Sequence, residues 1–287
     1  DSTVRALKLL RGEVDILQND LPAELLSYLD DEEAVQVSFA EGSNFAYIGF
    51  NLQDPHTSIL PVRQAIAHAI NREAIIEYVL GGAAQPAAAL LPPDHWAGNP
   101  GLQGHTYDPE RARVLLAEAG FSAAQPLQLT YKTSTDAVRI RIATIIQQQL
   151  REVGIETRLQ SYDWGTFYGD IKSGHFQMYS LAWVGIKTPD IFRYAFHSSS
   201  LPPEGANRGR LASTRVDRLI ETAGQGDSLA AQAAAYRLLQ QELLQLLPYI
   251  PLWYEDHVFA ARIDIAGYRL ARDGNYDGLQ QIHRRSP

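Results

Sequence analysis

The sequence contains no cysteine, which excludes disulfide bonds, thiol catalysis and zinc sites built on thiolates. It also has no apolar stretch long enough to span a bilayer. Lysine and arginine are scattered and the formal net charge is -8, so the basic patch that would bind nucleic acid is missing. The composition therefore indicates a globular protein whose expected partners do not include nucleic acid.

Sequence motifs of common catalytic and metal sites are also missing. The eight histidines never recur at i, i+4 spacing and none lies in a recognisable metal motif, so we expect no metal site. There is no G-x-S-x-G elbow, no Gly-rich phosphate loop and no close pair of loop carboxylates. We therefore predict a binding protein without a cofactor rather than an enzyme, and an α/β hydrolase is the enzymatic alternative.

The chain opens with DSTVRALKLL, which already has a helical pattern. It has no initiator methionine and no signal segment at this point. We therefore expect Asp1 to lie inside a longer natural chain.

The clearest supersecondary unit spans residues 126–162. PLQLTYKT alternates as a strand, DAVRIRIATIIQQQLREVG is an amphipathic helix, and IETRLQSY is a second strand. Short loops between them predict a parallel pair with a right-handed crossover. A further helix, capped by Asp163, leads to the strand FQMYSLAW, which ends at Trp183. Ligands bind at the carboxyl edge of such sheets, and Trp183 lies at that edge.

Two other segments carry clear patterns. Apolar residues between 61 and 79 repeat at helical spacing and predict one helix, which Gly81-Gly82 ends. The segment PYIPLWYEDHVFAARIDIAGYRL predicts two strands, Ile250–Tyr254 and His257–Ala261. Together with the parallel unit, these patterns predict an α/β fold.

Aromatic residues gather at strand ends, where they could line a cleft for a small molecule or a peptide. Core packing is the alternative for Trp164 and Trp253. Trp183 is favoured as a binding residue because Gly185 and Pro189 place it beside an irregular loop.

Charged residues near these aromatics give weaker signals. The loop GANRGR, residues 205–210, carries two arginines that could hold a carboxylate in a bidentate manner, although a solvated loop is an equal alternative. Lys187 and Asp190 are similarly ambiguous.

Seven stretches of the chain form an ordered pattern. They are GEVDI (12–16), YIGFN (47–51), VRQAIAHAINREAIIEYVLGGAAQPA (62–87), YDPERARVLLAEAGF (107–121), IQQQLREVGIETRL (146–159), GHFQMYSLAWVG (174–185) and PYIPLWY (248–254). As an ordered set they resemble the extracellular solute-binding proteins of the peptide/nickel family, family 5, which serve bacterial ABC importers. The resemblance covers nearly the whole chain.

The resemblance implies a type II periplasmic-binding-protein fold, in which two α/β lobes are joined by two hinge strands. Residues 47–51 and 248–254 would be the hinge crossings, and residues 52–247 a complete lobe II. Residues 1–46 and 255–287 would be remnants of lobe I, whose larger N-terminal part would be missing. A lobe II without a complete lobe I cannot close, so we expect this chain alone to bind solute weakly.

The resemblance also implies the function and the site. The protein would capture a small solute, with an oligopeptide as the first expectation, in an interlobe cleft and deliver it to a membrane ABC permease. Nickel complexes, glutathione and sugars are alternative solutes, and an envelope solute sensor is an alternative role. The location would be periplasmic or extracellular. The expected ligand-binding residues are Asn51, Trp183, Gly185, Ile186, Lys187, Asn207, Arg208, Tyr249 and Trp253.

One position departs from the family pattern. Peptide-binding members carry an aspartate three residues after the strand-end tryptophan, where it pairs with the α-ammonium group of the ligand. This chain has Ile186 there, and Thr188 stands in place of the acid that precedes the proline. The resemblance therefore implies a peptide cleft whose usual ammonium anchor is absent.

Overall fold

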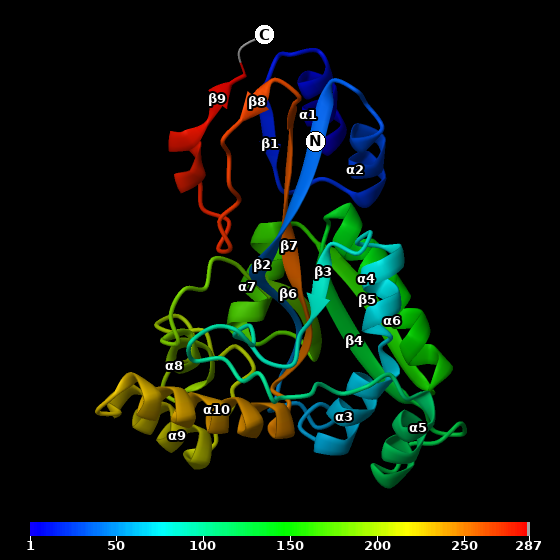
Figure 1. The fold of residues 1–287 in the computed structure, drawn as a ribbon. Coiled ribbons are helices and arrows are strands. Elements are labelled where there is room, and N and C mark those ends of the chain that lie inside the picture. Colours follow the sequence, from blue (N-terminus) through cyan, green and yellow to red (C-terminus); the bar gives the residue numbers. More distant parts are fainter. Residues whose placement is uncertain (286–287) are drawn as a thin grey trace.

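The structure, a computed structural model, describes residues 1–285 and shows a mixed α/β fold (Figure 1). Its strands are β1 (Ile16–Gln18), β2 (Val35–Phe50), β3 (Ala84–Pro86), β4 (Leu127–Ser134), β5 (Ile155–Tyr162), β6 (Met178–Trp183), β7 (Tyr249–Arg262), β8 (Ile265–Ala266) and β9 (His283–Arg284). Its helices are α1 (Ser2–Leu10), α2 (Ala23–Asp30), α3 (Leu60–Ala69), α4 (Arg72–Tyr78), α5 (Pro109–Glu118), α6 (Ala137–Glu152), α7 (Trp164–Ser173), α8 (Ile191–Phe196), α9 (Thr214–Gln225), α10 (Leu229–Leu246) and the 3-10 helix η1 (Asp277–Gln281). The α/β prediction is confirmed.

Short acidic side chains fix where three of these helices begin. Asp108, Asp136 and Asp163 each accept a hydrogen bond from the backbone N–H three residues further on, at the starts of α5, α6 and α7. Gly174 adopts a left-handed conformation and ends α7, as a residue without Cβ does readily. Helices α6 and α7 therefore start directly after the strands that precede them.

Two long strands, β2 and β7, run through two groups of elements (Figure 1). The smaller part contains α1, β1, α2, β8, η1 and β9, and the larger part contains the elements from α3 to α10. In the smaller part Leu9, Leu29 and Val35 pack in a hydrophobic cluster of their own. Because the two parts have separate cores, β2 and β7 are the main covalent and hydrogen-bonded link between them.

The main sheet has the strand order β1-β7-β2-β6-β4-β5, and β3 pairs with β7 outside this path. Strand β4 is parallel to both β5 and β6, whereas β2 is antiparallel to β6 and β7. The parallel pairing of β4 with β5 around α6 confirms the strand–helix–strand unit predicted from the sequence.

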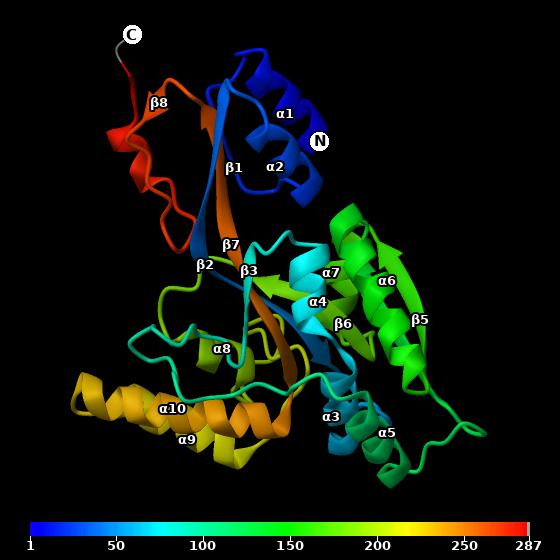
Figure 2. The ribbon, with the colours of Figure 1, turned by 45° about the vertical axis from the view of Figure 1, so that its right-hand side comes forward.

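Alternate side chains of β2 enter two different hydrophobic layers. Phe45 and Tyr47 pack with residues of α7, α8, α9 and α10, whereas Ala46 and Ile48 pack with residues of α3, α4, α5 and α6. This period of two is what a strand buried on both faces requires. The larger part is thus a sheet with helices on both faces (Figure 2).

The link between the parts contains an irregularity in β2. Ala40 pairs with His257 and Asn44 pairs with Glu255, so four residue steps along β2 match two steps along β7. Extra residues of this kind bend a strand and increase its twist. The segment between Ala40 and Asn44 is therefore the point at which the paired strands change direction.

The sequence predicted the crossings at residues 47–51 and 248–254. In the structure Tyr47 to Phe50 pair with β6 inside the larger part, and Tyr47 and Ile48 are fully buried. Pairing and packing on both sides hold these residues in place. We propose that the crossings lie instead at residues 40–44 and 255–257.

Two other predicted elements differ in the structure. The helix expected over residues 61–79 is two helices, because Ile70 has an extended backbone and Asn71 caps α4 by accepting a hydrogen bond from the Ala74 N–H. The two strands expected at 250–254 and 257–261 are one continuous strand, β7. Across residues 1–285, no helix is both long enough and apolar enough to cross a membrane.

A partly buried histidine makes the stability of the larger part depend on pH. Burial lowers the pKa of His105 to about 4, and the neighbouring His68 and Arg72 act in the same direction. The unfolded chain takes up this proton near pH 6.5, so stability is lost as the pH falls from about 6.5 to about 4.

We expect His105→Gln to remove part of this acid sensitivity. The difference in unfolding free energy between pH 7 and pH 4.5 should shrink by about 2 kcal/mol, less than the full shift would give, because solvent reaches part of the ring. Urea titrations at the two pH values measure it, and His175→Gln, at an exposed ring, is the control. An unchanged difference in His105→Gln would contradict this role.

Candidate functional site

A cavity of about 1030 Å³ lies between the two parts. The smaller part contributes lining residues that include Asn19, Asp20, Asp273 and Tyr276, and the larger part contributes Ser134, Asp136, Arg139, Trp164 and Val184. Glu255 and His257, on the linking strand β7, complete the wall. A volume of this order accommodates a small ligand, since ligand pockets span roughly 300–1,000 Å³.

The cavity lies at the carboxyl ends of the three parallel strands. Ser134 ends β4, Trp164 follows the end of β5, and Val184 follows the end of β6, and all three line the cavity. Open α/β sheets bind ligands at this edge because the loops after the strands diverge there. The expected position of a ligand at the carboxyl edge thus coincides with the main cavity between the parts.

Trp164 is an exposed aromatic residue of the cavity wall. It is the first residue of α7, and 58% of its surface is exposed. Its position is fixed by the preceding residue Asp163, which caps the helix through the Thr166 N–H. An exposed tryptophan on a cavity wall offers a large, rigid apolar face at low entropic cost.

Ion pairs surround the cavity and join the two parts. Arg139 on α6 makes a bidentate contact with Glu255 on β7, at 2.6 and 3.2 Å. Burial alone would raise the pKa of Glu255, but the charge and hydrogen bonds of Arg139, together with Trp253 and His257, more than offset this and lower it. Lys187 Nζ lies 2.6 Å from Asp273 Oδ2, so this pair bridges the larger and the smaller part.

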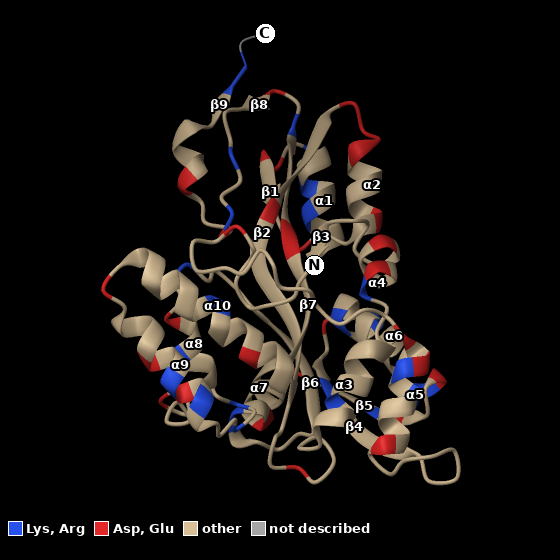
Figure 3. Ribbon diagram, turned by 60° about the horizontal axis from the view of Figure 1, so that its bottom comes forward, with Lys and Arg blue, Asp and Glu red and all other residues tan. Residues whose placement is uncertain are grey.

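Further contacts of this kind join Arg141 to Glu24 and Arg272 to Asp94. Figure 3 shows Lys and Arg segments interspersed with Asp and Glu segments along the helices of the larger part. Because the arginines and the lysine at the junction are paired with acids from the other part or from β7, they can stabilise one relative position of the two parts.

A second group of aromatic residues lies behind the cavity wall. Tyr47 stacks on Tyr249 with ring centroids 3.9 Å apart, and Tyr179 meets Tyr47 edge to face. Arg208 Nη1 donates a hydrogen bond to Tyr47 Oη at 3.0 Å. Burial raises the pKa of Tyr47 and of Tyr179 well above 10, so these phenols stay neutral and give Arg208 no counter-charge.

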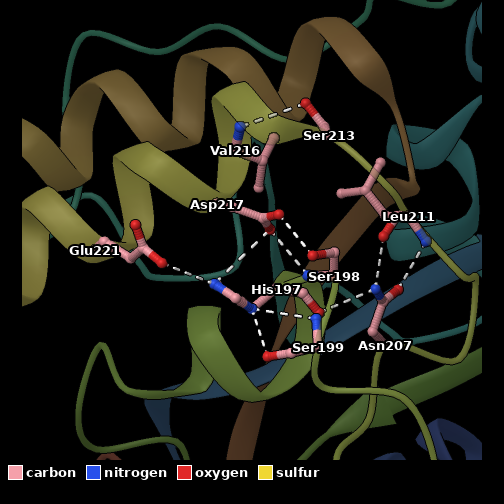
Figure 4. A network of polar contacts seen from close by, with 9 residues as sticks. All are labelled: His197, Ser198, Ser199, Asn207, Leu211, Ser213, Val216, Asp217 and Glu221. Carbon is pink, nitrogen blue, oxygen red and sulfur yellow. Dashed lines mark hydrogen bonds and ion pairs between the residues drawn. The ribbon is translucent and has the colours of Figure 1, made fainter.

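The loop that carries Arg208 is held by a network of polar contacts (Figure 4). Asn207 donates to the carbonyls of His197 and Leu211 and accepts from the Leu211 N–H, which closes the loop. Ser198 binds Asp217 through both its N–H and its hydroxyl, at 2.9 and 2.6 Å. With its side-chain amide satisfied, Asn207 fixes the backbone next to Arg208.

The same network contains a serine and a histidine in contact. His197 Nδ1 lies 2.7 Å from Ser199 Oγ, and His197 Nε2 lies 3.4 Å from Glu221 Oε1. None of these three residues lines the large cavity. We interpret the contacts as part of the loop network, because a nucleophile needs a substrate position beside it.

The structure separates the expected binding residues into three groups. The first group lies on either side of Val184, next to the cavity but not on its wall, and consists of Trp183, Gly185, Ile186 and Lys187. Asn207, Arg208, Tyr249 and Trp253 are buried in the larger part, and Tyr249 lines a separate cavity of about 20 Å³. The amide of Asn51 donates to the carbonyls of Gly174 and Phe176 at 3.2 Å, away from the cavity.

Two kinds of residue at the cavity were not among those expected from the sequence. Trp164 was noted as an aromatic at a strand end, and the cap at Asp163 would have placed it at the start of a helix on the ligand edge. The acids and the arginine, Arg5, from the smaller part carry no sequence signal, because only folding brings them to the larger part. Within residues 1–285, no three histidine or acidic side chains are grouped so that they could hold a metal ion.

Comparison with known proteins gives one family. Residues 1–201 match the family model described as bacterial extracellular solute-binding proteins, family 5 Middle. The chain is 28% identical over 276 residues to the dipeptide-binding protein of Escherichia coli, covering 93% of this chain and 51% of that protein. It is 31% identical over 257 residues to heme-binding protein A of Haemophilus influenzae, covering 88% and 46%.

A solved structure agrees with these relatives. The periplasmic binding protein DppA of Helicobacter pylori, in complex with the peptide STSA, superposes with a TM-score of 0.88 at 25% identity. The superposition covers 100% of this chain and 56% of that one. The chain thus spans about half the length of the relatives it matches, and it has the type II periplasmic-binding-protein fold that the resemblance implied. It belongs to the bacterial extracellular solute-binding proteins of family 5.

Proposed function

We propose that this chain is part of the solute-binding component of an ABC importer and that it captures a small peptide in the cavity between its two parts. The observation that carries this proposal is the cavity at the carboxyl ends of β4, β5 and β6, with Trp164 exposed on its wall. The relatives in Escherichia coli and Helicobacter pylori are named for peptide or solute binding. Their names support a binding role rather than an enzymatic one.

Capture follows from contacts that differ between two relative positions of the parts. The crossings at residues 40–44 and 255–257 join the parts, so a change at the bulge alters the width of the cavity. A peptide that touches both walls stabilises the closed position by the difference in its contacts. The Lys187–Asp273 pair joins the two parts in the position that the structure shows, and so would favour that position.

The class of solute follows from the cavity lining. The wall has a large aromatic face at Trp164 and polar side chains at Ser134, Asn19 and Arg139, of which Asn19 also bonds His257 and Arg139 also bonds Glu255. Peptides offer backbone amides and carbonyls that such groups bind, and side chains that an aromatic wall accommodates. Ile186 supplies no charge for an ammonium group, so we propose that acids of the cavity wall such as Asp20 bind it instead.

The proposed partner is a membrane ABC permease, and the proposed location is the periplasm or the cell exterior. The Helicobacter pylori protein is described as periplasmic and associated with an ABC transporter, which supports both proposals. The closed form would present the surfaces of both parts together to the permease.

Mass spectrometry under native conditions tests the binding role. The complete gene product is incubated with an equimolar library of synthetic di- and tripeptides, and the retained mass is read after buffer exchange. Retention of intact peptides is expected. Cleaved products would contradict a binding protein, and retention of nothing from the library, with retention of hemin in a parallel sample, would contradict the peptide class.

A further inference from the structure

A column of aromatic rings and one cation connects the cavity wall to the interior of the larger part. Trp164, on the wall, stacks on Tyr168 with ring centroids 5.3 Å apart and planes 7° apart. The Arg208 guanidinium carbon lies 5.3 Å from the Tyr168 ring centroid and 4.6 Å from that of Trp183. We call Trp164, Tyr168, Arg208 and Trp183 the aromatic–arginine column.

The spacing in the sequence explains half of this column. Trp164 and Tyr168 are four residues apart on α7, so their side chains lie on the same face of the helix. Trp183 ends β6, and Arg208 lies in the loop that Asn207 closes. Three separate segments therefore meet at one guanidinium group.

Arg208 is buried and has no acidic partner. Only 5% of its surface is exposed, and none of the ion pairs within 4.0 Å in residues 1–285 involves its guanidinium. Its hydrogen-bond partners are two phenols, Tyr47 Oη at 3.0 Å and Tyr168 Oη at 3.1 Å. Its charge is met instead by the faces of Trp183 and Tyr168, since aromatic faces attract cations.

A buried charge held in this way has a cost, which is why its place in the fold is informative. A structural role alone would be served by an apolar residue of similar size, because buried charges without ionic partners are unfavourable. The planar guanidinium can do what an apolar side chain cannot. It stacks on the Trp183 ring and donates to Tyr168 Oη at the same time, which fixes the direction of both rings.

We propose that Arg208 is a positioning residue: it does not contact the solute but fixes Trp183 and Tyr168, and through Tyr168 it holds Trp164 in the orientation that the cavity wall needs. This inference rests on the proposed solute-binding function for its effect on affinity, but its effect on the rings does not depend on that function. This proposal replaces the expectation from the sequence that Arg208 binds a carboxylate of the ligand. The guanidinium lies behind the wall, and Arg208 is absent from the cavity lining.

Fluorine NMR of protein labelled with 5-fluorotryptophan tests this role directly. This chain contributes tryptophans at positions 96, 164, 183 and 253, and single Trp→Phe variants assign their four resonances. The first variant, Arg208→Met, removes both the charge and the planar guanidinium group. The second, Arg208→Lys, keeps the charge but not the planar group. Arg218→Met, at an exposed position on α9, is the matched control.

In Arg208→Met we expect the resonances of Trp183 and Trp164 to shift and broaden while those of Trp96 and Trp253 stay in place. Affinity for the best peptide of the library, measured by calorimetry on the complete gene product, should fall about 10-fold. Arg208→Lys should restore the Trp183 resonance toward its original position but not that of Trp164, because an ammonium group cannot stack on one ring and bond the Tyr168 hydroxyl with the same geometry.

Two results would overturn the proposal. One is an unchanged Trp164 resonance in Arg208→Met, which would show that Arg208 does not influence the orientation of Trp164 on the cavity wall. The other is an equal shift of all four resonances together with a large fall in melting temperature, which would show a general packing role. If the wild-type protein retains no peptide, the proposed function fails, and the resonances still decide whether Arg208 positions the rings.

Discussion

Replacing Trp164 with alanine should weaken peptide binding by roughly 30-fold, which corresponds to about 2 kcal/mol. The indole is the largest aromatic face on the cavity wall, and 58% of its surface is exposed before a solute binds. A peptide that covers this face removes apolar surface from water on both molecules. Calorimetry of the complete gene product with the best-retained peptide measures the change.

The same substitution should leave the fold largely intact, because a half-exposed side chain contributes little to the core. We expect the unfolding free energy to fall by about 1 kcal/mol through loss of the contact with Tyr168. Trp96→Ala is the matched control, since Trp96 is also partly exposed but lies outside the cavity lining. Equal losses of affinity in the two variants would remove Trp164 from the binding site.

The substitution Gly42→Ala should destabilise the protein by about 3 kcal/mol. Gly42 lies in the irregular segment between Ala40 and Asn44, and a Cβ there would come within 2.0 Å of the backbone oxygen of Glu255. A backbone oxygen cannot swing aside as a side chain can, so β2 and β7 must separate at the crossing. Chemical denaturation monitored by circular dichroism measures the loss.

Gly224→Ala is the control for this substitution. Gly224 lies in α9, and a Cβ there would meet no atom within 4 Å. Alanine should stabilise that helix by about 0.5–1 kcal/mol, because glycine is unfavourable inside a helix. Wild-type stability in Gly42→Ala would mean that the strands are not held in close contact at this point, and the proposed crossing would lose its basis.

The sequence was informative where structure is set by neighbouring residues. The unit from β4 to β5 was predictable because its caps, periodicity and ending glycine are local signals, as at Asp136 and Gly154. The break between α3 and α4 was missed because the apolar period continues through it. Only the side chain of Asn71, which caps α4, marks the break.

The crossing proposed at residues 40–44 and 255–257 rests on contacts that the sequence does not show. A bulge depends on how two strands match, and β2 and β7 are about 200 residues apart in the chain. Tyr47 and Ile48 look like a linking strand in sequence, but they are paired with β6 as well as with β7. Pairing on both sides becomes visible only in the folded sheet.

The candidate site was predictable in position but less so in its residues. The carboxyl edge of the parallel strands follows from their order, which local patterns give. Which aromatics face solvent does not follow, because a tryptophan at a strand end has the same sequence signature whether it is buried like Trp253 or exposed like Trp164. The wall contributed by Asn19, Asp20 and Asp273 depends on how the smaller part docks.

A crystal structure of the complete gene product with its best-retained peptide tests the central claim most directly. We predict density for the peptide at the carboxyl ends of β4, β5 and β6, within 4 Å of Trp164 on one side and of a residue from the smaller part on the other. A peptide bound elsewhere, or one that touches only one of the two parts, would contradict capture between them.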